Sequence, residues 1–125
     1  MRLGFCALAI ATEVGCASSP PPESDPFTTL ENRIGETLTV RGFLQYEFED
    51  HNLFAKKSKE GDHSIGALCI PVEASGALEA RLTALHEQEV VIEGEVARFY
   101  DRAKGELNSY YCKEVGLYVR AVRPG

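Results

Sequence analysis

The sequence predicts one mainly β domain of five strands, with a helix between the third and the fourth. Long segments alternate apolar and polar residues, which is typical of strands that bury one face. A single segment, residues 75–86, instead spaces its leucines as a helix does. Strands and helices do not alternate regularly along the chain, so a parallel α/β sheet is not expected.

The first part of the domain is predicted to form a short turn or helix and then a long bent strand. Thr28 and Glu31 have the spacing of a capping box, and Gly35 would end that element. The strand covers residues 38–48, and Gly42 in its middle is typical of a bend or bulge. The residues expected to face the core are Leu38, Val40, Leu44, Tyr46 and Phe48.

Two short strands and a polar loop are predicted next. A turn at Glu49–Asn52 precedes a strand over residues 53–56. Residues 57–64 form the polar loop, and the third strand covers residues 65–72.

The helix and the last two strands complete the predicted domain. Ser75 is the expected N-cap, and the helix carries one apolar stripe of Leu78, Leu82 and Leu85. The fourth strand covers residues 89–100, with Gly94 midway, and the fifth covers residues 110–122. Val115, Leu117 and Val119 are expected to point inward from the fifth strand.

This order resembles the OB-fold, a five-stranded Greek-key barrel with a helix between strands 3 and 4. The resemblance covers residues 36–123 and includes the paired segments Val40-Arg41-Gly42 and Ile92-Glu93-Gly94. In these features the chain is similar to small bacterial exported OB-fold proteins. A small antiparallel sandwich with one helix is the alternative fold.

The N-terminal residues 1–17 are typical of an export signal. Arg2 precedes a charge-free apolar run, Leu3–Ala11, that is far shorter than the ~20 residues of a membrane-spanning helix. We therefore expect the signal to be removed and residues 27–125 to fold as one domain. Residues 18–26 are rich in Ser and Pro and form the predicted tether between them.

The signal ends in a sequence that resembles a bacterial lipobox. Val14 and Gly15 precede Cys16, the residue that would carry the lipid, while Glu13 departs from the lipobox pattern. Ala17 after the cysteine suggests, by the same resemblance, an outer-membrane lipoprotein. Ordinary cleavage after Ala17 is the alternative, and it would release the domain into the periplasm.

Two cysteines remain in the domain, which is an even number in a chain expected in an oxidising compartment. In an OB-fold the third and fifth strands are neighbours, so the resemblance implies that Cys69 and Cys112 lie close together. The alternation of each strand predicts that both thiols face away from the core. A Cys69–Cys112 disulfide is the resulting prediction, and two free thiols are the alternative.

Residues of the metal-ligand type occur at both ends of the predicted second strand. Glu49, Asp50 and His51 lie at one end and Asp62 and His63 at the other. A strand of that length separates its ends by ~15 Å, so we expect no metal site and no cofactor. No Ser-His-Asp motif or nucleophile elbow is present, and His86 is expected to interact with the helix dipole.

These observations favour a non-catalytic binding or scaffolding module anchored in the cell envelope by a lipid. The expected ligand-binding residues are the aromatic side chains Phe43, Tyr46, Phe54 and Tyr100, and the same binding regions of the fold also contain Phe48, Tyr110 and Tyr111. A net charge of −6 disfavours nucleic acid, so the expected partner is an envelope protein or a glycan. The alternatives are a single-stranded oligonucleotide or oligosaccharide binder and a metal-dependent hydrolase.

Overall fold

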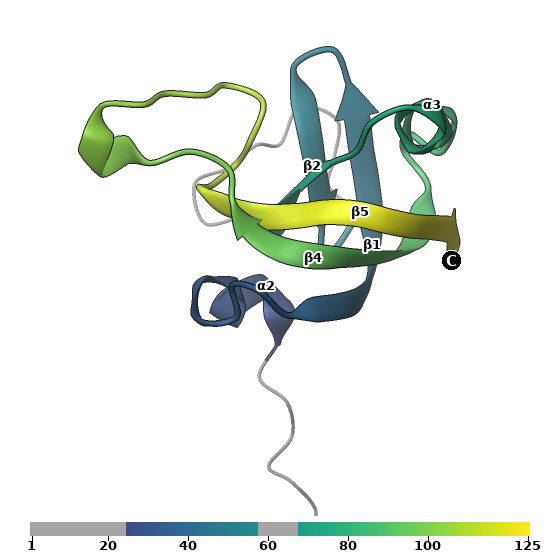
Figure 1. Cartoon of the computed structure of the whole chain (residues 1–125). Coiled ribbons are helices and arrows are strands. Elements are labelled where there is room, and N and C mark those ends of the chain that lie inside the picture. Colours follow the sequence, from purple (N-terminus) through teal and green to yellow (C-terminus); the bar gives the residue numbers. More distant parts are fainter. Residues whose placement is uncertain (1–24, 58–67) are drawn as a thin grey trace, which may run out of the picture.

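The computed structural model describes residues 25–57 and 68–125, and its five strands form a closed barrel (Figure 1). The strands are β1 (Thr37–Glu47), β2 (Asp50–Phe54), β3 (Cys69–Glu73), β4 (Glu89–Arg98) and β5 (Val115–Pro124). Around the barrel they follow the order β1-β2-β3-β5-β4, in which β3 and β5 run parallel. Helix α3 (Ala77–Ala84) lies between β3 and β4 in the chain. The OB-like barrel is therefore confirmed, and the chain does not form the alternative sandwich.

A short helix, α2 (Pro26–Thr29), and a 3-10 turn, η1 (Leu30–Asn32), precede β1. Asp25 caps α2 by accepting a hydrogen bond from the amide of Phe27 at 3.0 Å. The predicted capping box is wrong because Pro26 starts the helix and the cap falls on Asp25 rather than on Thr28. The predicted signal and the start of the tether, residues 1–24, lie outside the described residues. No described helix has the length and apolar character needed to cross a bilayer.

One hydrophobic core fills the barrel and extends to both helices. Phe27 of α2 and Leu30 of η1 are buried in it with Leu82 of α3. The predicted alternation of β1 is confirmed at Val40 and Leu44, whose side chains are buried. The strands supply the rest of this core: Tyr46, Leu53, Ile70, Val72, Val90, Ile92, Val96, Val115, Leu117, Val119 and Val122.

The turn between β1 and β2 is shorter than the sequence suggested. Glu47 pairs directly with Asp50, so only two residues, Phe48 and Glu49, connect the strands. The predicted burial of Phe48 is wrong: the residue is 81% exposed because the strand ends before it. His51, predicted in the turn, instead belongs to β2 and pairs with Tyr46 of the neighbouring strand β1.

Other element boundaries also differ from the expected ones. The N-cap of helix α3 is Gly76, with a φ of 63°, rather than the expected Ser75. No side chain caps the start of this helix with a hydrogen bond. Strand β5 begins at Val115 rather than at Tyr110, so residues 110–114 belong to the preceding loop. Residues 58–67, which include most of the predicted polar loop and the start of the predicted third strand, lie outside the described part of the chain.

Two glycines allow the barrel strands to pack closely. Gly94, midway along the fourth strand, lies at an irregularity in the β4–β5 register. Gly116 of β5 faces β3, and a Cβ there would lie only 2.3 Å from the carbonyl oxygen of Pro71. That oxygen belongs to the backbone of the neighbouring strand, so it cannot move away as the end of a flexible side chain can.

We expect the Gly116→Ala substitution to lower the free energy of unfolding by about 3 kcal/mol, because the added methyl group forces β3 and β5 apart. Urea unfolding followed by circular dichroism measures the change. Ala121→Val, which enlarges the side chain by two carbon atoms at an exposed position of the same strand, is the matched control and should change stability little. Equal stability of wild type and Gly116→Ala would contradict the close approach.

Candidate binding site

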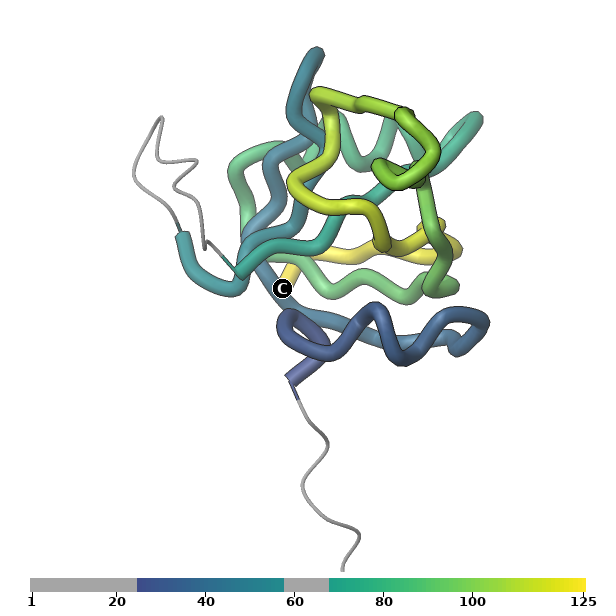
Figure 2. Tube along the Cα trace, turned by 90° about the vertical axis from the view of Figure 1, so that its left-hand side faces the viewer, coloured from purple at the N-terminus to yellow at the C-terminus, as the bar shows by residue number. Residues whose placement is uncertain are grey.

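An open pocket of about 510 Å³ lies where the β1–β2 turn, α3 and the loop 99–114 meet. Figure 2 shows this loop, drawn in green to yellow, beside the β1–β2 turn. We call this feature the rim pocket. Its lining residues are Tyr46, Glu47, Phe48, His51, Glu73, Glu79, Thr83, Asn108, Tyr110 and Tyr111.

Asn52 of β2 holds the loop 99–114 against the barrel. Its side-chain amide donates to the carbonyl oxygen of Tyr110 at 3.0 Å, and its Oδ1 accepts from the amide of Cys112 at 2.8 Å. The backbone amide of His51 also donates to the Tyr110 carbonyl oxygen, at 3.0 Å. Asn52 is only 5% exposed, so losing either loop contact would leave a buried amide group unsatisfied.

A disulfide joins the same loop to β3. Cys69 and Cys112 are bonded, with their Cα atoms 6.5 Å apart and 43 positions apart in sequence. The predicted pairing is confirmed, although Cys112 lies in the loop before β5 rather than in the strand itself. The bridge fixes the loop immediately after Tyr110 and Tyr111, the two loop tyrosines that line the rim pocket.

The Glu73 carboxylate lies at the centre of the rim pocket and accepts four hydrogen bonds. Oε1 accepts from the Tyr46 hydroxyl at 2.7 Å and from the Ala74 amide at 3.3 Å. Oε2 accepts from the Tyr111 hydroxyl at 2.5 Å and lies 3.1 Å from Nδ1 of His51. Every oxygen of this carboxylate is therefore engaged by the protein itself.

These hydrogen bonds decide which groups of the cluster are ionised. Burial by itself would raise the pKa of the Glu73 carboxyl, but hydrogen bonds from Tyr111, Tyr46 and His51 outweigh burial and lower it. Burial and the Glu73 carboxylate together raise the pKa values of the Tyr46 and Tyr111 hydroxyls. At neutral pH the cluster thus contains one carboxylate surrounded by neutral phenols.

The rings around Glu73 form a stack. The His51 ring lies nearly parallel to Tyr46, with centroids 4.1 Å apart, and to Tyr110, with centroids 5.4 Å apart. Tyr111 packs edge-on against Phe99 at 4.8 Å. Because hydrogen bonds fix one end of Tyr46 and Tyr111 and stacking fixes their neighbours, the pocket wall is ordered without a ligand.

His86 joins the turn after α3 to β1. Its Nδ1 accepts a hydrogen bond from the backbone amide of Tyr46 at 3.0 Å, and its Nε2 lies 3.0 Å from the Glu47 carboxylate. We expected this ring to interact with the helix dipole. The structure places it two residues beyond Ala84, the last residue of α3, where it contacts Tyr46 and Glu47 of β1 and lies 3.6 Å from the Glu87 carboxylate.

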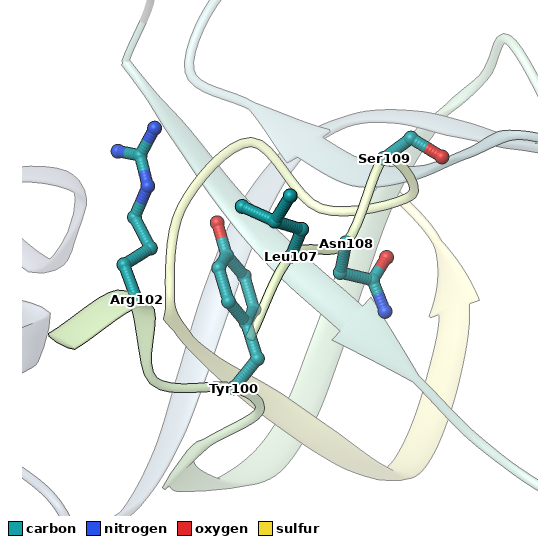
Figure 3. Close-up of a pocket in the computed structure, with 5 residues that line it drawn as sticks. All are labelled: Tyr100, Arg102, Leu107, Asn108 and Ser109. Carbon is teal, nitrogen blue, oxygen red and sulfur yellow. The ribbon is translucent and has the colours of Figure 1, made fainter. Parts of the chain in front are cut away.

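The four expected ligand-binding residues lie in three different places. Tyr46 lines the rim pocket, and Tyr100 lines a second pocket of about 430 Å³ within the loop 99–114 (Figure 3). Phe43 and Phe54 pair with each other across β1 and β2 and line neither pocket. The structure therefore does not bring the four together.

The second pocket borders the first. Figure 3 shows the Tyr100 ring beside the Leu107 side chain, with Arg102 nearby. Asn108 lines both pockets, and Leu107 next to it is 85% exposed. The loop thus presents an apolar side chain beside the rim pocket.

Sequence reasoning missed Glu73, the residue that organises the pocket. A single acidic residue at the end of an apolar strand, Ile70-Pro71-Val72-Glu73, is the signal that marks it. In the described residues, no three His, Cys, Asp or Glu side chains are placed to hold one metal ion. Asp62 and His63 lie outside those residues, so the expectation that they lie too far from His51 to share a metal ion stays a prediction.

The described part of the chain is a small β-barrel in which we find no catalytic constellation. His51 and Glu73 form a pair of the kind that orients a general base, but among the described residues neither Ser nor Cys lines the rim pocket. Comparison with known proteins assigns no family: the chain matches no protein-family model and no curated protein.

We expect Glu73→Gln to lower the free energy of unfolding at pH 7 by about 1–3 kcal/mol, because an amide group would face three side-chain donors. A carboxyl whose pKa is lowered by folding stabilises the protein above its unfolded pKa, about 4.3 for glutamate. This contribution disappears as the pH falls through the folded pKa. The stability difference between wild type and variant should therefore be constant above pH ~5 and shrink below pH ~4.

Urea unfolding at a series of pH values measures this difference. Glu93→Gln removes an exposed carboxylate from β4, outside the pocket, and is the matched control. A stability gap for Glu73→Gln that stays the same down to pH 2 would show that the carboxylate does not hold the cluster together.

We expect the double substitution of Cys69 and Cys112 by Ser to lower the free energy of unfolding by about 4 kcal/mol, the chain-entropy value for a loop of this length. Hydrogen exchange of the amides of residues 108–112 should accelerate more than that of β4. Wild type treated with a reductant is the control and should match the variant. An unchanged exchange rate in the loop would contradict the role of the bridge.

Proposed function

We propose that this chain is a non-catalytic binding module of the bacterial cell envelope and that the rim pocket receives its partner. The observation that carries the proposal is the stack of His51 on Tyr46 and Tyr110, fixed beside the Glu73 carboxylate before any ligand binds. A preorganised wall lowers the entropy cost of association. Tyrosine is also among the residues that contribute most to protein interfaces.

The charges around the rim pocket favour a partner other than nucleic acid. Glu47, Glu73 and Glu79 line the pocket, and no Lys or Arg among the described residues does. A phosphate backbone would be repelled here, since nucleic-acid affinity depends on neutralising phosphates with basic side chains. Arg102 is in the neighbouring loop pocket, and one arginine is too few to offset three carboxylates.

The exposed apolar side chains at the rim favour a protein over a glycan. Phe48 stands at the tip of the β1–β2 turn and Leu107 in the loop 99–114, and both are among the most exposed large apolar residues described. Aromatic and apolar side chains concentrate at the centres of protein interfaces. We therefore propose a protein partner, with an oligosaccharide as the alternative ligand.

The envelope location rests on the N-terminal residues and on the disulfide. The apolar run, the lipobox-like Val14-Gly15-Cys16 and the Pro/Ser-rich residues 17–26 are typical of a lipid-anchored domain on a spacer. The Cys69–Cys112 bridge fits an oxidising compartment such as the periplasm. A lipid on Cys16 would hold the rim pocket near a membrane, within reach of soluble envelope proteins and of membrane proteins with exposed segments.

We expect Phe48→Ser to reduce capture of the protein partner from the membranes of the source cell at least tenfold, because Phe48 would be buried in the complex. Ile34→Ser is the matched control, since Ile34 is also an exposed apolar residue in a turn but precedes β1 instead of following it. Quantitative mass spectrometry of material cross-linked to each full-length protein measures the loss. Partners retained equally by both variants would contradict the proposal.

A second control separates the tether from the pocket. Cys16→Ser should move the chain from the membrane fraction to the soluble fraction and leave capture that depends on Phe48 intact. Wild-type chain found uncleaved in the cytosol would remove the envelope part of the proposal.

A further inference from the structure

We infer that the rim pocket takes a cationic side chain, an arginine presented by the protein partner next to an apolar residue. This inference rests on the proposed function, because it names the chemistry that the partner brings to the pocket. Three features of the lining carry it: its hydrogen-bond acceptors, its negative charge and its exposed ring faces.

Glu73 decides whether the groups around it offer hydrogen-bond donors or acceptors to a ligand. An ionised carboxylate can only accept, so the Tyr46 and Tyr111 hydroxyls both donate their protons to it. His51 Nδ1 also donates to the same carboxylate. The Tyr46 and Tyr111 hydroxyls are therefore left with only their oxygen lone pairs for a ligand, and these accept hydrogen bonds.

Few hydrogen-bond donors are left in the lining beside these acceptors. The Thr83 hydroxyl already donates to the carbonyl oxygen of Glu79 at 3.1 Å. Asn108 accepts from the Tyr110 amide through Oδ1, so its NH₂ group and the Tyr110 hydroxyl are the side-chain donors that these described lining residues leave available. A ligand rich in N–H donors matches this arrangement, and a guanidinium carries five of them.

The charge of the lining points to the same ligand. Glu79, in the first turn of α3, forms no ion pair with another described residue, and the Glu47 carboxylate lies 3.0 Å from Nε2 of the His86 ring. Together with Glu73 these residues place three carboxylates around a space that no Lys or Arg in the described part of the chain lines. A cation between them would relieve their mutual repulsion and gain their attraction.

The exposed ring faces favour arginine over lysine. Tyr110 is 37% exposed although one ring face packs on His51, and Phe48, which also lines the pocket, is 81% exposed. A planar guanidinium stacks on such rings while its edge donates hydrogen bonds, whereas an ammonium is a point charge. Phe48 and Leu107 would then contact the apolar residue beside the arginine.

The test is a titration of the full chain, followed by two-dimensional NMR, with the peptide acetyl-Gly-Arg-Leu-Gly-amide. We expect shifts at residues 46–51 and 108–111 and a dissociation constant on the order of 1 mM, as for one buried side chain. The peptide with citrulline in place of arginine keeps the shape and loses the charge. It should bind at least tenfold more weakly, and the lysine peptide should lie between the two.

Glu79→Gln tests the charge without breaking any described hydrogen bond of the side chain. It should weaken arginine-peptide binding at least threefold, while the control Glu93→Gln leaves binding unchanged. Equal binding of the arginine and citrulline peptides, or equal binding by the two variants, would overturn the inference. Saturable binding of diacetylchitobiose in place of the arginine peptide would overturn it in favour of a glycan.

This experiment can fail separately from the proposed function. If Phe48-dependent capture of a protein partner holds and the arginine peptide does not bind, the pocket is a binding site for another chemistry. If neither is seen, the proposed function falls as well.

Discussion

The Glu73 carboxylate is the interaction on which the functional end of the barrel depends. It stands at the end of β3 and accepts hydrogen bonds from Tyr46 of β1, from His51 of β2 and from Tyr111 of the loop 99–114. One side chain thereby fixes three strands and a long loop relative to one another. A buried carboxylate is tolerated because its hydrogen bonds offset the loss of solvation, as the lowered pKa of Glu73 indicates.

The loop 99–114 carries one 3-10 turn, η2 (Arg102–Lys104), and otherwise no regular structure. Ordering such a segment is entropically costly, and a long loop without constraints would leave its tyrosines free to move. Here Asn52, the Cys69–Cys112 bridge and the Tyr111 hydroxyl bond all act within the three residues from Tyr110 to Cys112. The constraints are thus concentrated on the residues that line the rim pocket, while Leu107 farther along the loop remains exposed.

The element order, the core alternation of β1 and the disulfide could be predicted from the sequence because each depends on local periodicity or on a resemblance in strand order. The burial of Phe48 could not, because a shift of one residue in a tight turn moves a side chain from the core to solvent. The role of Glu73 could not be predicted either. Its partners lie 27, 22 and 38 positions away in sequence, and only the closed barrel brings them together.

The same carboxylate also decides what the pocket presents to a ligand. By accepting the protons of two phenols, Glu73 turns groups that both donate and accept into groups that accept. The two phenols do not neutralise its charge, because they are neutral donors. The pocket therefore combines a net negative charge with acceptor atoms on rigid aromatic rings. Stability and selectivity for a cation arise from one set of hydrogen bonds, so a change that loosened the cluster would weaken both.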